Sequence, residues 1–294
     1  MLPPLRVLLE GLIDYAGLFP PAALAMPEAV LNYAAYRTGP DRWALGRFVV
    51  PADRLPEFER ATDGLAAPGD PWLLSVLVGA NEAGQVEAAR AFNARHAAAS
   101  DATADVLEGK AATADGIAAL AAAARPGFTL HVEVPADPDP APLIAAIGTA
   151  GARAKIRTGG VTAEAFPSAA QVARFLAACV RLGVPFKATA GLHHPIRAVY
   201  PLTYAPDAPR GTMFGYLNVV LATALLHGGG SQADATRLLE ESRLGAFAFS
   251  DHGVRWEGFR FALADLAESR RLALGVGSCS FDEPLDDLVT AGLR

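Results

Sequence analysis

The chain has 294 residues, 52% of them hydrophobic, and a formal net charge of −6. A chain of this length and apolar content can form one large α/β barrel or two smaller domains. Its acidic balance, without a long run of like charges, argues against a nucleic acid partner, which requires a basic surface.

The cysteines and the apolar segments bear on where the protein works. Cys179 falls in a helical pattern and Cys279 in a Gly/Ser-rich segment, so we expect no disulfide framework, a reducing compartment and a cytoplasmic protein. Arg6 and Glu10 interrupt the apolar N-terminal stretch, which we therefore expect to be part of the fold and not a signal peptide. Residues 217–226 form an apolar stretch well short of the roughly 20 residues that span a bilayer. We expect no membrane partner.

Along the chain, short runs rich in Val, Leu, Ile and Phe alternate with longer alanine-rich segments of helical period. This alternation is typical of repeated strand–helix units around a parallel sheet. We predict a single (β/α)8 barrel, of the TIM-barrel type, forming one domain over residues 1–294. The eight predicted strands span residues 11–14, 45–50, 72–78, 105–108, 129–134, 152–157, 185–189 and 246–250.

Predicted helices fill the gaps between these strands. Examples span residues 27–36, 82–97, 112–124 and 169–182. The last of them opens at Ser168, a residue type that caps helix N-termini, and ends at Gly183. Longer connections interrupt the alternation at 198–211 and 228–231, and long loops on a barrel are often functional. The Gly-Gly-Gly-Ser turn at 228–231 lacks the context and spacing of a dinucleotide site, so we predict no nucleotide cofactor.

The chain contains only three lysines, Lys110, Lys155 and Lys187, against 22 arginines, and each lysine lies at the end of a predicted strand. Unlike arginine, lysine can lose its proton at accessible cost and attack a carbonyl group as an amine. The alternative interpretation is that these lysines only form structural ion pairs.

In a (β/α)8 barrel the carboxyl ends of the strands converge on one mouth. Two ammonium groups close together disfavour each other's charge, which lowers the amine pKa and lets one act as a nucleophile while the other stays charged. A neighbouring carboxylate can move protons while the amine condenses with an aldehyde or ketone. This pattern predicts Schiff-base chemistry. The residues predicted at the mouth are Asp14, Glu108 with Lys110, Glu133, Lys155 with Arg157, Lys187 with Thr189, and Asp251 with His252.

The chain resembles the class I deoxyribose-phosphate aldolases, through motifs that occur in the same order along most of its length. Residues 12–20 read Leu-Ile-Asp-Tyr-Ala-Gly-Leu-Phe-Pro, where the family has Leu-Ile-Asp-His-Thr-Leu-Leu-Lys-Pro. Residues 104–108 read Ala-Asp-Val-Leu-Glu against Ala-Asp-Glu-Val-Asp, and the fifth strand ends in a glutamate in both. Residues 155–159 read Lys-Ile-Arg-Thr-Gly against Lys-Thr-Ser-Thr-Gly. Residues 186–193 read Phe-Lys-Ala-Thr-Ala-Gly-Leu-His against Phe-Lys-Pro-Ala-Gly-Gly-Val-Arg.

The resemblance implies an aldolase-like lyase that acts on a small carbonyl substrate without a cofactor or metal. By position, Lys155 is the imine-forming lysine, Lys187 the partner that lowers its pKa, and Glu108 the proton-relay acid, where the family has aspartate. We assign Asp14 to the same catalytic group. A homo-oligomer is compatible with the alanine- and leucine-rich helices. The predicted substrate-binding residues are Glu133, Arg157, Thr158, Thr189, Gly191, His193, Asp251 and His252.

One departure from the family concerns the substrate. The chain keeps one glycine of a family pair, Gly191, and an aspartate, Asp251, follows the predicted eighth strand. An aspartate at that place would repel a phosphate dianion. We therefore expect a non-phosphorylated carbonyl substrate, or a phosphate held elsewhere, by Arg157 or Arg197.

Other functions stay open at this point. An imine on a keto acid would equally serve a dehydratase or a decarboxylase. A metal-assisted isomerase or hydrolase would use Glu133, His193, Asp251 and His252, with His194 beside them, although no His-x-His or His-x-x-x-His spacing supports a metal site. A barrel without catalysis, serving as a binding protein, is the third alternative.

Overall fold

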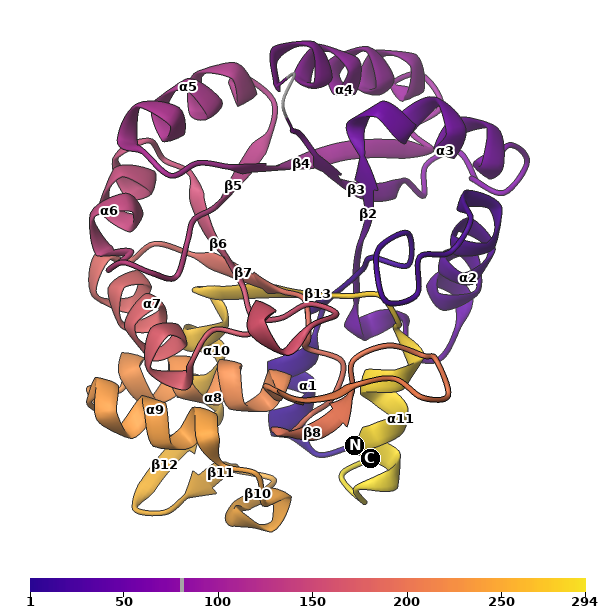
Figure 1. Cartoon of the computed structure of the whole chain (residues 1–294). Coiled ribbons are helices and arrows are strands. Elements are labelled where there is room, and N and C mark those ends of the chain that lie inside the picture. Colours follow the sequence, from indigo (N-terminus) through magenta and orange to yellow (C-terminus); the bar gives the residue numbers. More distant parts are fainter. Residues whose placement is uncertain (80–81) are drawn as a thin grey trace.

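The structure, a computed structural model, describes residues 1–79 and 82–294. Eight parallel strands close into a barrel in the order β1-β13-β7-β6-β5-β4-β3-β2 (Figure 1), which confirms the predicted (β/α)8 fold class. The barrel strands are β1 (Ile13–Tyr15), β2 (Leu45–Pro51), β3 (Trp72–Leu77), β4 (Ala102–Lys110), β5 (Thr129–Glu133), β6 (Arg153–Arg157), β7 (Phe186–Thr189) and β13 (Ala273–Ser278).

Helices surround this ring on its outer side (Figure 1). Helix α7 begins and ends where the sequence predicts: the Ser168 side chain accepts the Gln171 backbone N–H, and Gly183 adopts a left-handed φ of 63°. The α-helices are α1 (Pro3–Leu9), α2 (Met26–Thr38), α3 (Leu55–Thr62), α4 (Glu82–His96), α5 (Ala114–Ala124), α6 (Ala141–Thr149), α7 (Ala169–Leu182), α8 (Tyr216–His227), α9 (Gln232–Glu240), α10 (Leu263–Arg270) and α11 (Asp282–Thr290). Short 3-10 helices are η1 (Arg42–Ala44), η2 (Ala52–Arg54), η3 (Ala163–Ala165) and η4 (Leu244–Ala246).

The prediction placed the eighth barrel strand at the wrong residues. Residues 247–250 form β10 (Phe247–Ser250), which pairs with β11 (Gly253–Trp256) and β12 (Phe259–Ala262) in a separate antiparallel sheet. Two-residue turns join these strands, and such turns impose antiparallel pairing, whereas a parallel partner needs a long crossover. The true eighth strand, β13, escaped prediction because its sequence, Ala-Leu-Gly-Val-Gly-Ser, contains two glycines that weaken the strand pattern.

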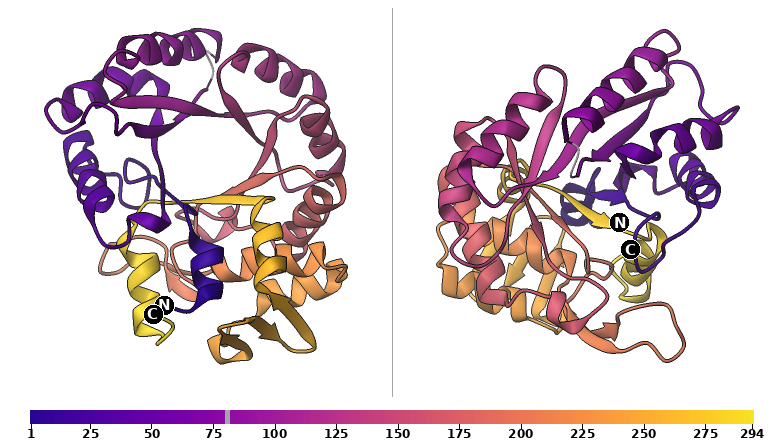
Figure 2. Two further views of the ribbon diagram at one scale, coloured as in Figure 1. Left: turned by 180° about the vertical axis from the view of Figure 1, so that it is seen from behind. Right: turned by 45° about the horizontal axis from the view of Figure 1, so that its top comes forward.

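The segment between β7 and β13 is much longer than the other crossovers. It contains the three-stranded sheet and a hairpin of β8 (Ala198–Pro201) and β9 (Arg210–Met213), which occupies the predicted long connection. Figure 2 shows from two further sides that both lie outside the barrel ring, and that the two chain ends lie next to each other. Helix α8 in the same segment is buried because α7, α9 and α10 pack against it. In the described parts of the chain, no helix combines the length and apolarity that crossing a membrane requires.

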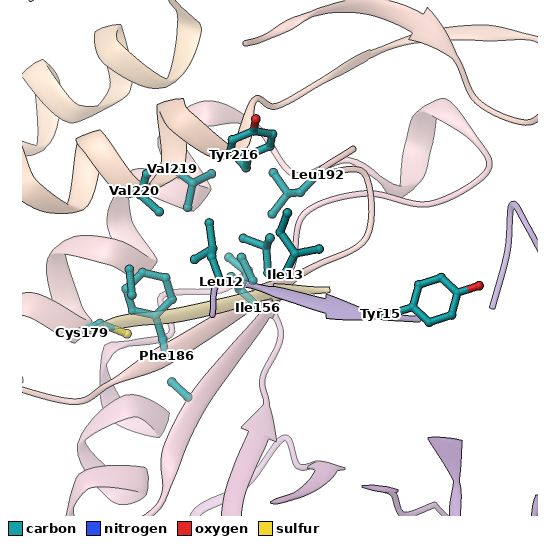
Figure 3. Packing of buried hydrophobic residues seen from close by; sticks show 14 of the residues in the cluster. Leu12, Ile13, Tyr15, Ile156, Cys179, Phe186, Leu192, Tyr216, Val219 and Val220 are labelled. Atoms are coloured by element: carbon teal, nitrogen blue, oxygen red, sulfur yellow. The ribbon is translucent and has the colours of Figure 1, made fainter. Parts of the chain in front are cut away.

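A layer of apolar side chains lies between the barrel and the helices (Figure 3). Ile156 of β6 and Phe186 of β7 point outward into it, toward Cys179 of α7 and Val220 of α8. Successive side chains of a strand point to opposite faces. The residues next to Ile156 and Phe186 in sequence therefore point into the barrel, and these include both buried lysines.

We expect Phe186→Ala to lower the free energy of unfolding by about 3–5 kcal/mol. The ring is 1% exposed and packs edge-on against Phe175, with 5.7 Å between the ring centroids. Leu31→Ala is the control, because Leu31 is 59% exposed on α2 and should change stability by less than about 0.5 kcal/mol. Urea denaturation measures both, and equal losses would contradict the burial of Phe186.

Candidate active site

Two lysines stand side by side inside the barrel and share one carboxylate. Lys155 on β6 is the register partner of Lys187 on β7, and the two residues are 4% and 1% exposed. Lys155 Nζ lies 2.7 Å from Glu108 Oε2, and Lys187 Nζ lies 2.6 Å from Glu108 Oε1. Glu108 of β4 is itself buried, so both cations are neutralised in a region from which water is largely excluded.

Each lysine also contacts a second carboxylate. Lys187 Nζ donates to Asp14 Oδ2 at 2.5 Å, and Lys155 Nζ lies 3.0 Å from Glu133 Oε2. The result is a row of alternating charges that crosses the barrel, which we call the charge chain: Asp14, Lys187, Glu108, Lys155 and Glu133. The prediction from sequence that these five residues meet at the carboxyl ends of the strands is consistent with this geometry.

The far end of the charge chain carries two further cations. Lys110 Nζ lies 3.0 Å from Glu133 Oε1, and Arg157 Nε lies 3.4 Å from the same oxygen. The side chains of both are largely open to solvent, 68% exposed for Lys110 and 47% for Arg157. The predicted mouth residues therefore divide into a buried row and a solvent-facing pair at its end.

Glycines give the charge chain the space it needs. Strand β13 lies between β7 and β1, so the Lys187 side chain must pass across it to reach Asp14. The register partners of Lys187 and Asp14 on that strand are Gly275 and Gly277. A Cβ at Gly277 would lie 2.7 Å from Thr189 Oγ1, and a Cβ at Gly46 of β2 would collide with Asp14 Oδ1. Glycine at positions 46 and 277 is a steric requirement of the site.

Two neighbouring strands anchor the carboxylates. The Arg47 backbone N–H of β2 donates to Asp14 Oδ1 at 2.6 Å, and the Ser75 hydroxyl of β3 donates to Glu108 Oε1 at 2.5 Å. Each of these two carboxylates is therefore held by a group of a neighbouring strand as well as by a lysine. A serine within an apolar strand gives no signal of its role, so Ser75 could not be predicted from the sequence.

The pKa values follow from burial and from the opposing charges. Burial raises the pKa of Glu108, but Lys155 and Lys187 outweigh burial and hold it well below its usual range. Burial likewise raises the pKa of Glu133, and Lys155 and Arg157 bring it down to about 2. Burial lowers the pKa of Lys187, yet Asp14 and Glu108 outweigh this effect and the pKa is raised. The expected mutual lowering therefore does not apply to Lys187, because carboxylates lie on both of its sides, and this lysine stays charged.

His131 is a buried residue of the barrel interior that was not among the predicted site residues. It lies on β5, two residues before Glu133, and is the register partner of Glu108. Burial lowers its pKa to about 3, so the ring is neutral at neutral pH. Among the described residues, neither of its ring nitrogens has a hydrogen-bond partner. The two-residue spacing from Glu133 is the signal that could have placed it on the inner face of the barrel.

A cavity of about 290 Å³ opens above the charge chain. Lys155, Lys187 and Glu108 line it, with Arg157, Thr189 and His193 also on its wall. Phe19, Val49 and Leu77 give it an apolar side. The combination of apolar walls and a few convergent ionic groups is typical of a site for a small molecule.

Other predicted site residues have different places. The Thr158 hydroxyl is buried and donates to the Ala190 carbonyl oxygen at 2.7 Å, while a Cβ on Gly191 would press against Phe166. We infer that both shape the loops after β6 and β7. Asp251 and His252 were predicted at the mouth, but they form the exposed turn between β10 and β11 and do not line the cavity.

The position of Asp251 outside the mouth changes two further expectations. Strand β13 ends at Ser278, whose hydroxyl lies 3.1 Å from His193 Nδ1, so no Asp251 carboxylate is present there to repel a phosphate. The charge argument against a phosphorylated substrate therefore loses its basis. The four residues of the metal-dependent alternative are not gathered in one place, and in residues 1–79 and 82–294 no group of three or more His, Cys, Asp or Glu side chains is arranged to hold a metal ion.

No model of a known protein family matches this chain, and no curated protein matches it either. The fold and the site define the protein as a (β/α)8 barrel with a buried row of ion pairs at the end of the barrel where such folds place their active sites.

Glu133 is expected to contribute pH-dependent stability. Its folded pKa is about 2, against about 4.3 in an unfolded chain. Because the folded pKa is the lower one, the contribution is complete above about pH 4.3 and is lost as the pH falls toward about 2. The difference corresponds to about 3 kcal/mol. We expect the destabilisation by Glu133→Gln to be largest at neutral pH and to shrink as the pH falls below about 4.3 in urea denaturation. The exposed control Glu87→Gln should show little effect, and a pH-independent loss in Glu133→Gln would contradict these ion pairs.

We expect Gly46→Ala to destabilise the fold by about 1–3 kcal/mol, because the added methyl group must displace Asp14 or the neighbouring backbone. Gly245→Ala is the matched control, since nothing lies within 4 Å of a Cβ at that position. Thermal denaturation compares the two variants, and a neutral Gly46→Ala would show that Asp14 does not need this space.

Proposed function

We propose that the protein is a Schiff-base-forming lyase of the aldolase type, in which Lys155 forms an imine with a small carbonyl substrate. The observation that carries this proposal is the pair of buried lysines on one carboxylate, directly beneath the cavity at the barrel mouth. The resemblance to class I deoxyribose-phosphate aldolases assigns the imine to the same lysine. We propose the chain as a divergent relative of that family.

The charges around the lysines favour Lys155 as the nucleophile. Lys187 donates hydrogen bonds to both Asp14 and Glu108, and its pKa is raised, which ties its proton in place. Lys155 Nζ, in contrast, contacts Glu108 and Glu133 and is not held by Asp14, so we assign the role of nucleophile to Lys155.

The proposed reaction starts with transfer of a proton from Lys155 to Glu108. The free amine attacks the carbonyl carbon, the carbonyl oxygen takes a proton from Glu108, and the resulting carbinolamine loses water to form a protonated imine. The imine nitrogen then accepts the electron pair of the breaking carbon–carbon bond, while a base removes the hydroxyl proton of the departing fragment. The new positive charge on nitrogen replaces the ammonium charge between Glu108 and Glu133.

A dehydratase or decarboxylase acting on a keto acid would use the same imine as its electron sink, so product analysis separates these reactions. The free state of both cysteines supports a reducing compartment, and we propose the cytoplasm as the setting.

Borohydride trapping tests the proposal. The protein is incubated with acetaldehyde, pyruvate or dihydroxyacetone, reduced with borohydride, and mapped by peptide mass spectrometry. We expect an adduct on Lys155 that disappears in Lys155→Met and persists in Lys110→Met, because Lys110 is exposed outside the buried row. Adducts confined to Lys110 and the N-terminal amine, or no adduct with any carbonyl compound, would contradict Schiff-base chemistry and favour a barrel without this activity.

A further inference from the structure

A second cavity, of about 270 Å³, lies beside the first and shares His193 with it. The β8–β9 hairpin and its turn contribute Thr203, Tyr204 and Met213 to its wall. Polar groups come from His194, which follows β7 in the chain, and from Glu283 of α11. None of the residues that line this cavity is a lysine or an arginine. The first cavity, in contrast, contains two lysines and Arg157.

His194 presents an unused nitrogen at this cavity. The residue is 9% exposed, and its Nδ1 lies 2.7 Å from Asp287 Oδ2. A carboxylate only accepts, so Nδ1 donates its proton to Asp287, and in this tautomer Nε2 is an acceptor. The Tyr200 ring stacks on the imidazole at 3.5 Å between centroids and fixes its plane. In the described part of the chain, Nε2 has no hydrogen-bond partner.

Glu283 presents a second acceptor. Its Oε2 accepts from the Tyr204 hydroxyl at 3.1 Å, while its Oε1 lies 3.9 Å from His194 Nε2, too far for a direct hydrogen bond. Burial raises the pKa of this carboxyl, and the opposing effects of His194 and of the Tyr204 hydrogen bond do not offset it. Two acceptors thus face one space with no donor between them.

We propose that the second cavity binds an ammonium group carried by the substrate, so that the preferred substrates are amino aldehydes or amino ketones. A protonated amine offers three donors, and its nitrogen can lie about 2.8–2.9 Å from two acceptors at this separation. His193 does not repel the cation, because burial lowers its pKa to about 4 and the ring is neutral at neutral pH. The proposal rests on the proposed function, in that the carbonyl end of the substrate lies at Lys155.

Three probes of equal length test the assignment in the trapping assay: 3-aminopropanal, 3-hydroxypropanal and butanal. We expect 3-aminopropanal to half-saturate the Lys155 adduct at a concentration at least about tenfold below that of butanal. In Glu283→Gln, the half-saturating concentrations of 3-aminopropanal and butanal should become nearly equal, and the value for butanal should stay unchanged. Asp286→Asn is the matched control, because it removes an equal charge from the exposed side of α11 and should leave the preference intact.

A second measurement does not depend on imine formation. Calorimetric titration of Lys155→Met with ethanolamine should show binding that is lost when Glu283→Gln is added. Absence of this binding, or an equal preference for 3-hydroxypropanal and 3-aminopropanal, would overturn the ammonium assignment. If no carbonyl compound is trapped while ethanolamine still binds through Glu283, the proposed function fails and the ammonium site stands.

Discussion

Burying two ammonium groups at the centre of a barrel is possible only if carboxylates face them on every side, and much of this structure serves that requirement. An unpaired buried charge destabilises a fold by several kcal/mol, of the order of its whole stability. Asp14, Glu108 and Glu133 lie between and beside Lys155 and Lys187, so no ammonium is left without a partner. A variant that removes one carboxylate therefore leaves a buried ammonium group with one partner fewer and destabilises the fold.

The barrel wall makes this arrangement rigid. Ile156 and Phe186 fill the apolar layer outside the strands, which holds the lysines on their inner faces in one register. The backbone of Arg47 and the hydroxyl of Ser75 hold two of the carboxylates from the neighbouring strands. Such support from packed strands is what preorganises a catalytic site, because the ionic groups need not rearrange when a substrate binds.

The long segment between β7 and β13 adds a second cavity to an otherwise regular barrel. It carries His193, His194 and the β8–β9 hairpin to the mouth, where they meet α11 and form the second cavity. The buried row can supply reactivity toward a carbonyl group, whereas the added segment can supply selectivity for the rest of the substrate. This division agrees with the way barrels acquire specificity through their loops.

The sequence alone determined the fold class, seven of the barrel strands and the residues of the charge chain, because alternating strand and helix periods and charges at strand ends are local signals. Only the tertiary structure decided the eighth strand, since glycines weaken the pattern of β13 while the aromatic β10 imitates a barrel strand. Because β10 is not a barrel strand, Asp251 and His252 also lie away from their predicted position at the mouth. The roles of Ser75, His131 and Gly46, and the position of Glu283 near His194, could also not be predicted from the sequence. Their roles depend on side chains far apart in the chain, and only cross-strand register and the packing of α11 bring these together.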